Sequence, residues 1–216
     1  RSVSRGLGDV YKRQESYNLP YEQDALIADL SVVNPSLVAV MVCGNAYAMP
    51  WHKKVPAIVQ AWYGGTEAGN AIADVLFGEV NPSGKLPFSF PVKIEDNAAH
   101  AFNAYPGDGE TVEYKEGIFV GYRWFEKEKI KPLFAFGHGL SYTSFDYGKI
   151  TLDKKTIKST DNITVTIPIT NSGNREGAEV VQLYIMDMES SLPRPLKELK
   201  GFKKVCLLYT SDAADE

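Results

Sequence analysis

The sequence predicts an α/β fold, an open and mostly parallel sheet flanked by helices, followed by a truncated all-β sandwich. From Glu15 onward, helical spacing alternates with short apolar runs, and beyond Phe145 apolar and polar residues alternate one by one. Hydrophobic residues make up 44% and charged residues 23% of the 216 residues, both within the globular range. The change of pattern places a domain boundary near residue 145.

The first elements are a helix and two apolar strands. Pro20 suits the first turn of a helix, and Asn34 and Pro35 end the helical pattern. Residues 37–42 are apolar throughout, which is typical of a strand covered on both faces in a parallel sheet. Residues 55–62 predict the next such strand. The apolar face of the helix is formed by Leu26, Ile27, Leu30 and Val33.

A second helix follows, which Thr66 can cap and Gly78 can end. Its apolar positions lie on one face, as expected of a helix that packs on a sheet. They are Ala68, Ala71, Ile72, Val75 and Leu76.

Residues 85–90 predict a further strand, which Pro87 and Pro91 mark as short or peripheral. Residues 93–121 are rich in Gly, Pro, Asn and acidic side chains and predict a surface linker. Beyond the boundary, the alternation at 163–170 predicts a half-buried strand. The turn at 171–174 separates it from 179–185, which predict a second strand, as in an antiparallel sandwich.

The two ends depart from these patterns. Residues 1–14 and 206–216 resemble translated sequencing-library adapter, and we leave them out of the fold prediction, although disordered termini are the alternative. The expected organisation is an artefact at 1–14, an α/β domain at 15–145, a truncated β domain at 146–205 and an artefact at 206–216. The true N-terminus is then missing, so the sequence says nothing of a signal peptide.

Composition excludes several classes of protein. A net charge of −4, spread along the chain, argues against a nucleic-acid partner. The apolar runs are much shorter than the roughly 20 residues of a membrane-spanning helix, so no membrane span is expected. Cys43 and Cys206 form neither a disulfide framework nor a cluster with metal-ligand spacing, so no metal site is expected.

Four motifs in order, and two further segments, carry a family resemblance. The motifs are residues 55–78 (VPAIVQAWYGGTEAGNAIADVLFG), 81–87 (NPSGKLP), 116–123 (EGIFVGYR) and 136–143 (FGHGLSYT). They resemble family 3 glycoside hydrolases, which include many β-glucosidases and β-xylosidases. Residues 171–184 and 194–202 are similar to the fibronectin type III-like domain at the C-terminal end of many members. The resemblance implies the family's α/β sandwich domain followed by the first strands of that β-sandwich.

The resemblance also implies a mechanism. Members are exo-acting and retaining, and retention needs two carboxyl groups about 5 to 5.5 Å apart. The family's nucleophile lies on a barrel domain that this chain lacks, and its acid/base glutamate lies just before the stretch that Leu19-Pro20 ends. We therefore assign no catalytic residue, Asp9 and Glu15 included, and expect the fragment to be inactive. No cofactor is implied, and the oligosaccharide or glycoside substrate would bind through the missing barrel.

Three aromatic residues are the candidates for sugar binding. Trp51, Trp62 and Tyr63 lie in loops after predicted strands, where ligands bind in open α/β sheets. The alternative is that they pack between domains, because aromatic side chains supply much of core and interface energy. A different class of function stays open as well, a noncatalytic carbohydrate-binding or scaffolding module. The sequence does not indicate the oligomeric state. A periplasmic or secreted location is expected only by analogy with the family.

Overall fold

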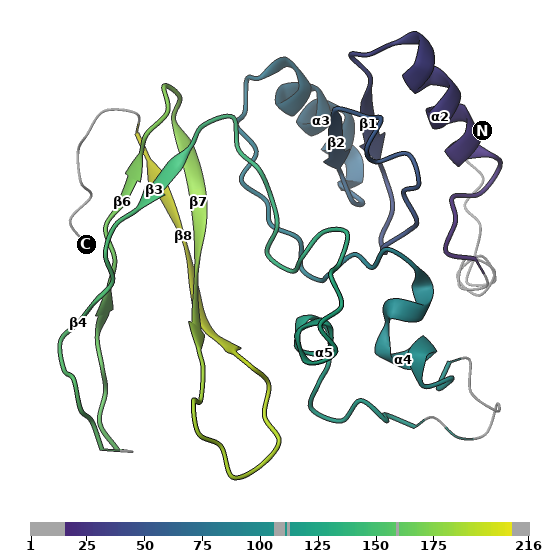
Figure 1. Ribbon diagram of the computed structural model, residues 1–216. Coiled ribbons are helices and arrows are strands. Elements are labelled where there is room, and N and C mark those ends of the chain that lie inside the picture. The colour runs from purple at the N-terminus through teal and green to yellow at the C-terminus, as the bar shows by residue number, and fades with distance from the viewer. Residues whose placement is uncertain (1–15, 106–110, 112, 159, 209–216) are drawn as a thin grey trace. The chain divides into compact units, whose positions relative to one another are not determined.

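The computed structural model describes residues 16–105, 111, 113–158 and 160–208, so the segment expected as an N-terminal artefact lies outside the described residues (Figure 1). The chain divides into two compact units. Unit 1 consists of Arg1–Ile72, Leu86–His138 and Ile185–Glu198, and unit 2 of Ala73–Lys85, Gly139–Tyr184 and Leu199–Glu216. The expected boundaries at 145 and 205 stay predictions.

Unit 1 begins with the helix and the two strands that the sequence predicts. Helix α2 is Gln23–Val33, and strands β1 (Val38–Met41) and β2 (Ala57–Gln60) pair in parallel, with Val38 opposite Ala57 and Met41 opposite Gln60. Ala39 and Met41, on one face of β1, are buried, whereas Val38 on the other face is 44% exposed, so the strand is fully covered on one face and not on both as expected. The parallel α/β arrangement at the start of the chain is confirmed.

The core of unit 1 is built mainly from the loop between β1 and β2. Tyr47, Met49 and Trp51 lie in this loop and are buried. The Phe90 ring meets that of Tyr47 edge to face at 5.8 Å and stacks on the Phe88 ring at 5.4 Å. The loop is therefore a folded part of the core, and it fixes the edge of the sheet where β1 and β2 end.

The second predicted helix begins with a tight turn. Residues Gly65–Glu67 form the 3₁₀ helix η1 and Ala68–Phe77 the α-helix α3. Thr66 was expected to cap this helix, but it lies inside η1, whose N-cap is Gly64 and has no side-chain cap hydrogen bond. Gly78 ends α3 as predicted, at a positive φ of 82° that glycine adopts without strain.

The strand predicted at 85–90 is wrong. This described stretch contributes one isolated bridge, Phe90 to Phe134. Pro87 and Pro91 lack the N–H that a continuous ladder needs, so the chain pairs irregularly, with Leu86 N donating to His138 O at 2.8 Å.

The expected linker at 93–121 contains short helices. They are η2 (Ile94–Asp96) and α4 (Ala98–Ala101), and α5 (Tyr122–Lys127) follows with Trp124 and Phe125 buried. Trp124 Nε1 donates to Asp96 O at 3.0 Å, and its ring lies 5.1 Å from that of Phe102. This part of the excursion is therefore packed onto α5.

Unit 2 contains the predicted β region. Strands β3 (Phe145–Tyr147) and β6 (Ile169–Asn171) pair antiparallel, as do β4 (Thr151–Leu152) and β5 (Val165–Thr166). Pro168 separates β5 from β6, which the sequence predicted as one strand, because proline cannot donate to a ladder. Strands β7 (Gly177–Ile185) and β8 (Glu198–Leu207) are hydrogen-bonded neighbours and run side by side in Figure 1.

The end of β8 overlaps the segment expected to be a C-terminal artefact. The strand runs through Cys206 to Leu207, two of the residues expected to belong to that artefact. Asn171 Nδ2 donates to Leu207 O at 3.2 Å, which ties β6 to β8. From residue 209 on, the expected artefact lies outside the described residues.

Candidate functional site

The candidate site lies where β1 and β2 end. Because the two strands are parallel, their carboxyl ends meet at one edge of the sheet, where open α/β sheets bind ligands. The loop after β1 begins with Val42 and continues with Cys43 and Gly44, and the loop after β2 contains Trp62 and Tyr63. Ala61 N donates to Met41 O at 2.8 Å, so the pairing continues one residue past β2 into the second loop.

The Gln60 side chain joins the two loops. Its Nε2 donates to Cys43 O at 3.0 Å, and its Oε1 accepts a hydrogen bond of 2.8 Å from the Tyr47 hydroxyl. Burial raises the pKa of Tyr47, and the neighbouring Cys43 and Tyr17 raise it further, so the phenol keeps the proton that it donates. The start of the loop after β1 is thus fastened to the last residue of β2.

Replacing Tyr47 by Phe tests this fastening. We expect the Tyr47→Phe variant to lose about 1 kcal/mol in the free energy of unfolding of unit 1, because Gln60 Oε1 loses its donor in a half-buried position. Native-state hydrogen exchange of the β1 and β2 amides measures this. Tyr114→Phe is the matched control, because this tyrosine of unit 1 is 77% exposed, and it should change the value by less than about 0.5 kcal/mol, as surface substitutions do. Equal losses in the two variants would contradict the role of Gln60.

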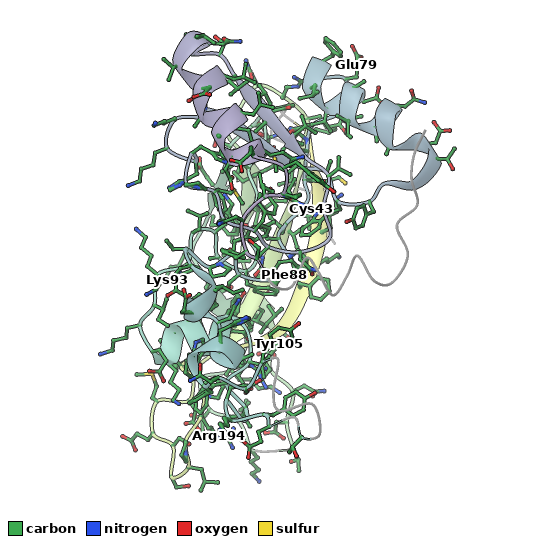
Figure 2. The ribbon with its side chains drawn as sticks, turned by 90° about the vertical axis from the view of Figure 1, so that its right-hand side faces the viewer. Cys43, Glu79, Phe88, Lys93, Tyr105 and Arg194 are labelled. Carbon is green, nitrogen blue, oxygen red and sulfur yellow. The ribbon has the colours of Figure 1, made fainter. Side chains whose placement is uncertain are left out.

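Trp62 and Tyr63 are adjacent in the chain but differ in exposure. Trp62 has a positive φ of 54°, and its half-buried ring meets those of Phe88 and Phe90 at 5.6 and 6.4 Å. Tyr63 is 65% exposed. Its ring lies so close to Gly44 that a Cβ added there would be 2.8 Å from Tyr63 Cε2. Figure 2 labels Cys43 and Phe88, which belong to the loop after β1 and to this ring cluster.

Trp51 occupies a different environment. It is 1% exposed, and its Nε1 donates to Asp24 Oδ1 at 2.7 Å. The other oxygen of Asp24 accepts a hydrogen bond of 3.2 Å from Leu19 N, so this carboxylate ties α2 to two segments outside it. This burial favours packing as the role of Trp51. Sugar binding by the three aromatic residues stays a prediction, and Tyr63 is the one that offers an exposed ring.

The acidic side chains near this edge have local partners. Glu67, in the turn that follows Tyr63, accepts a hydrogen bond of 2.6 Å from Asn70 Nδ2. Within the described ranges, no group of three or more His, Cys, Asp or Glu side chains is placed to hold a metal ion. None of the helices formed by the described residues is long and apolar enough to cross a membrane.

Comparison with known proteins identifies the family. Residues 6–142 match the glycosyl hydrolase family 3 C-terminal domain. The chain belongs to glycosyl hydrolase family 3. Residues 179–210 match the fibronectin type III-like domain that the family resemblance implied, and they include β7 and β8. The predicted fold class, an α/β domain followed by a fibronectin-like β region, is therefore confirmed.

Family 3 relatives cover nearly the whole chain. It is 54% identical over 195 residues to beta-glucosidase BoGH3A of Bacteroides ovatus, covering 89% of this chain and 26% of that protein. It is 46% identical over 209 residues to thermostable beta-glucosidase B of Acetivibrio thermocellus, covering 95% of this chain and 27% of the relative. The chain thus spans about a quarter of the length of the curated relatives that it matches.

Solved structures of the family agree with the fold. DesR, a beta-glucosidase from Streptomyces venezuelae in complex with D-glucose, is 43% identical with a TM-score of 0.83, over 89% of this chain and 24% of its own. Beta-glucosidase 3B from Thermotoga neapolitana in complex with glucose is 34% identical with a TM-score of 0.81, over 89% of this chain and 27% of its own. The fold described above is thus that of a segment of such enzymes.

Sequence reasoning did not identify the residues that shape this edge of the sheet. Gln60 had a usable signal, because it is the one strongly polar side chain in residues 55–62, an otherwise apolar run. A polar side chain at the end of a buried strand needs a hydrogen-bond partner, and that need could have flagged it. Gly44 had no such signal, since its closeness to Tyr63 is a tertiary feature.

Proposed function

We propose that the complete protein is an exo-acting, retaining glycosidase that releases terminal β-linked glucose, or xylose, from oligosaccharides or glycosides. The observation that carries the proposal is the 54% identity over 195 residues to a protein named beta-glucosidase. A second relative at 46% identity carries the same activity in its name. Because the chain spans about a quarter of these relatives, the activity is proposed for the complete protein and not for this segment.

Within this proposal, the edge of the sheet where β1 and β2 end supplies aromatic contacts to the substrate. Tyr63 presents an exposed ring and is the side chain that we expect to lie against a sugar face. Trp62 and Trp51 are packed within unit 1 and support the loops around it. The two carboxyl groups and water carry out the double displacement, so the proposal needs no metal or organic cofactor.

The first experiment is to sequence the source DNA across residue 15 and to express the complete reading frame. We expect hydrolysis of 4-nitrophenyl β-glucoside, with the β-anomer of glucose as the first product because the mechanism retains configuration. 4-Nitrophenyl β-xyloside tests the second sugar. A start codon immediately upstream, combined with binding of cello-oligosaccharides without hydrolysis, would replace the enzyme by a noncatalytic carbohydrate-binding module.

The role of Tyr63 predicts a kinetic change in the complete enzyme. We expect Tyr63→Ala to raise KM about 2- to 12-fold, because an aromatic face contact contributes about 0.5–1.5 kcal/mol. The value of kcat should change little if the ring binds ground state and transition state equally. Tyr114→Ala is the matched control, since this tyrosine is 77% exposed and lies in a different segment of unit 1. An unchanged KM in Tyr63→Ala would refute the sugar contact and leave the glycosidase assignment standing.

A further inference from the structure

The turn that follows α3 is held by polar side chains, and all the contacts described here lie inside unit 2. Asn81 uses both ends of its amide. Its Oδ1 accepts hydrogen bonds from Ser141 Oγ at 2.9 Å and from Tyr142 N at 2.8 Å, and its Nδ2 donates to Glu176 O at 2.8 Å. One side chain thus links residues 60, 61 and 95 positions away along the sequence.

Lys85, at the end of the same turn, forms a sheltered ion pair. Its Nζ lies 2.9 Å from Glu179 Oε1 and donates to Gly139 O at 2.7 Å. The side chains of Lys85 and Glu179 are only 17% and 11% exposed. Glu179 Oε1 also accepts a hydrogen bond of 2.8 Å from Val180 N, so the pair has the extra partners that a buried charge pair requires.

The C-terminal end of α3 is capped by two residues distant in the sequence, Tyr142 just before β3 and Arg175 between β6 and β7. The last carbonyl groups of a helix have no partners within it and carry partial negative charge. The Tyr142 hydroxyl donates to Val75 O at 2.8 Å, and the Arg175 guanidinium donates to Gly78 O. The same guanidinium lies 5.6 Å from the centre of the Tyr142 ring, a cation–π arrangement. A cation is therefore placed at the helix end that favours one.

At two glycines, the backbone approaches the turn too closely to leave room for a side chain. A Cβ added at Gly139 would overlap the carbonyl oxygen of Gly84, a backbone atom that cannot swing aside. A Cβ added at Gly177 would lie 2.8 Å from Asn81 Nδ2. Neither residue has a positive φ, so close approach is what favours glycine at both positions. The close approaches at the two glycines and the hydrogen bonds of Asn81 are thus independent evidence that the turn packs against residues 139–177.

We propose that Ala73–Lys85 and the β strands of Gly139–Tyr184 fold as one cooperative unit, clasped by Asn81, Lys85 and Arg175. Tyr142 and Arg175 then hold the end of α3, and the fibronectin type III-like region, which joins the clasp through Glu179, is not a separable, tethered binding module. This inference goes beyond the proposed glycosidase function and does not depend on it. Its failure would concern only the folding of unit 2.

Hydrogen exchange of the full 216-residue chain, followed by mass spectrometry, tests the clasp. We expect Lys85→Met to raise the exchange rates of slowly exchanging amides in Ala73–Lys85 and in β3, β6 and β7 by a common factor of roughly tenfold or more, because Glu179 loses its ion-pair partner. Amides of β1 and β2 should change by less than twofold. Faster exchange confined to residues next to 85 and 139 would overturn the proposal.

Two further variants keep the test decisive if Lys85→Met does not fold. Tyr142→Phe removes one hydroxyl and should raise exchange about threefold in both segments together, as loss of one neutral hydrogen bond does. Lys154→Met is the matched control, because Lys154 Nζ also donates to a backbone carbonyl, Asn162 O at 3.0 Å, but at an exposed position. It should leave Ala73–Lys85 unchanged. A response of one segment without the other in Tyr142→Phe would equally overturn the clasp.

Discussion

The purified 216-residue chain should hydrolyse 4-nitrophenyl β-glucoside no faster than a buffer blank. A retaining glycosidase loses its double displacement when either carboxyl group is missing. The chain spans about a quarter of the beta-glucosidases that it matches, and neither the nucleophile nor the acid/base is assigned to any of its residues. The measurement is release of 4-nitrophenol at high protein concentration, with the complete enzyme as the positive control.

The contacts of three described acidic residues agree with this expectation. Glu179 is paired with Lys85, Asp24 accepts hydrogen bonds from Trp51 and Leu19, and Glu67 accepts one from Asn70. Side chains engaged in this way are stabilising the fold. Circular dichroism must show that the assayed chain is folded. Hydrolysis above the blank by folded chain would refute the prediction and require a carboxyl pair within this segment.

The sequence predicted local helices and strands better than it predicted the long-range contacts of the loops. Strand β1 was predictable because four consecutive apolar residues, Val38–Met41, leave few alternatives to a covered strand. The strand at 85–90 failed because residues around Pro87 pair with distant residues through single contacts, which no local pattern encodes. The break at Pro168 could have been predicted, because proline has no N–H to donate to a ladder. The regular alternation of residues 163–170 led to the prediction of one strand instead.

The candidate site shows the same limit. The rule that ligands bind at the carboxyl ends of parallel strands directed attention to the correct loops, since it depends only on strand order. It could not separate Trp51, which is buried, from Tyr63, which is exposed, because both are aromatic residues in loops. Trp51 belongs to a core cluster that includes Phe90, and it donates to Asp24, 27 positions away in the sequence. Sequence patterns identify the loop, and such tertiary contacts determine which ring is buried.

Trp51→Ala should cause the largest loss of stability in unit 1, about 3–5 kcal/mol, as for other large aromatic side chains in cores. Trp51 is 1% exposed and belongs to the core cluster with Tyr47, Met49 and Phe90. Removing the indole leaves a cavity and also takes the donor away from Asp24 Oδ1. Both effects act on the loop that joins β1 and β2. Native-state hydrogen exchange of the β1 and β2 amides measures the loss without requiring the whole chain to unfold in one step.

Two variants separate the cavity from the hydrogen bond. Trp51→Phe retains an aromatic ring but not Nε1, so it should lose clearly less stability than Trp51→Ala, with the remaining loss due to Asp24 and to the smaller ring. Tyr114→Ala removes a ring of unit 1 that is 77% exposed and should change stability by less than about 0.5 kcal/mol. If Trp51→Ala were as mild as Tyr114→Ala, the indole would not be part of the core. In that case Trp51 would again be a candidate for sugar binding, equal to Tyr63, because packing would no longer explain why tryptophan occupies this position.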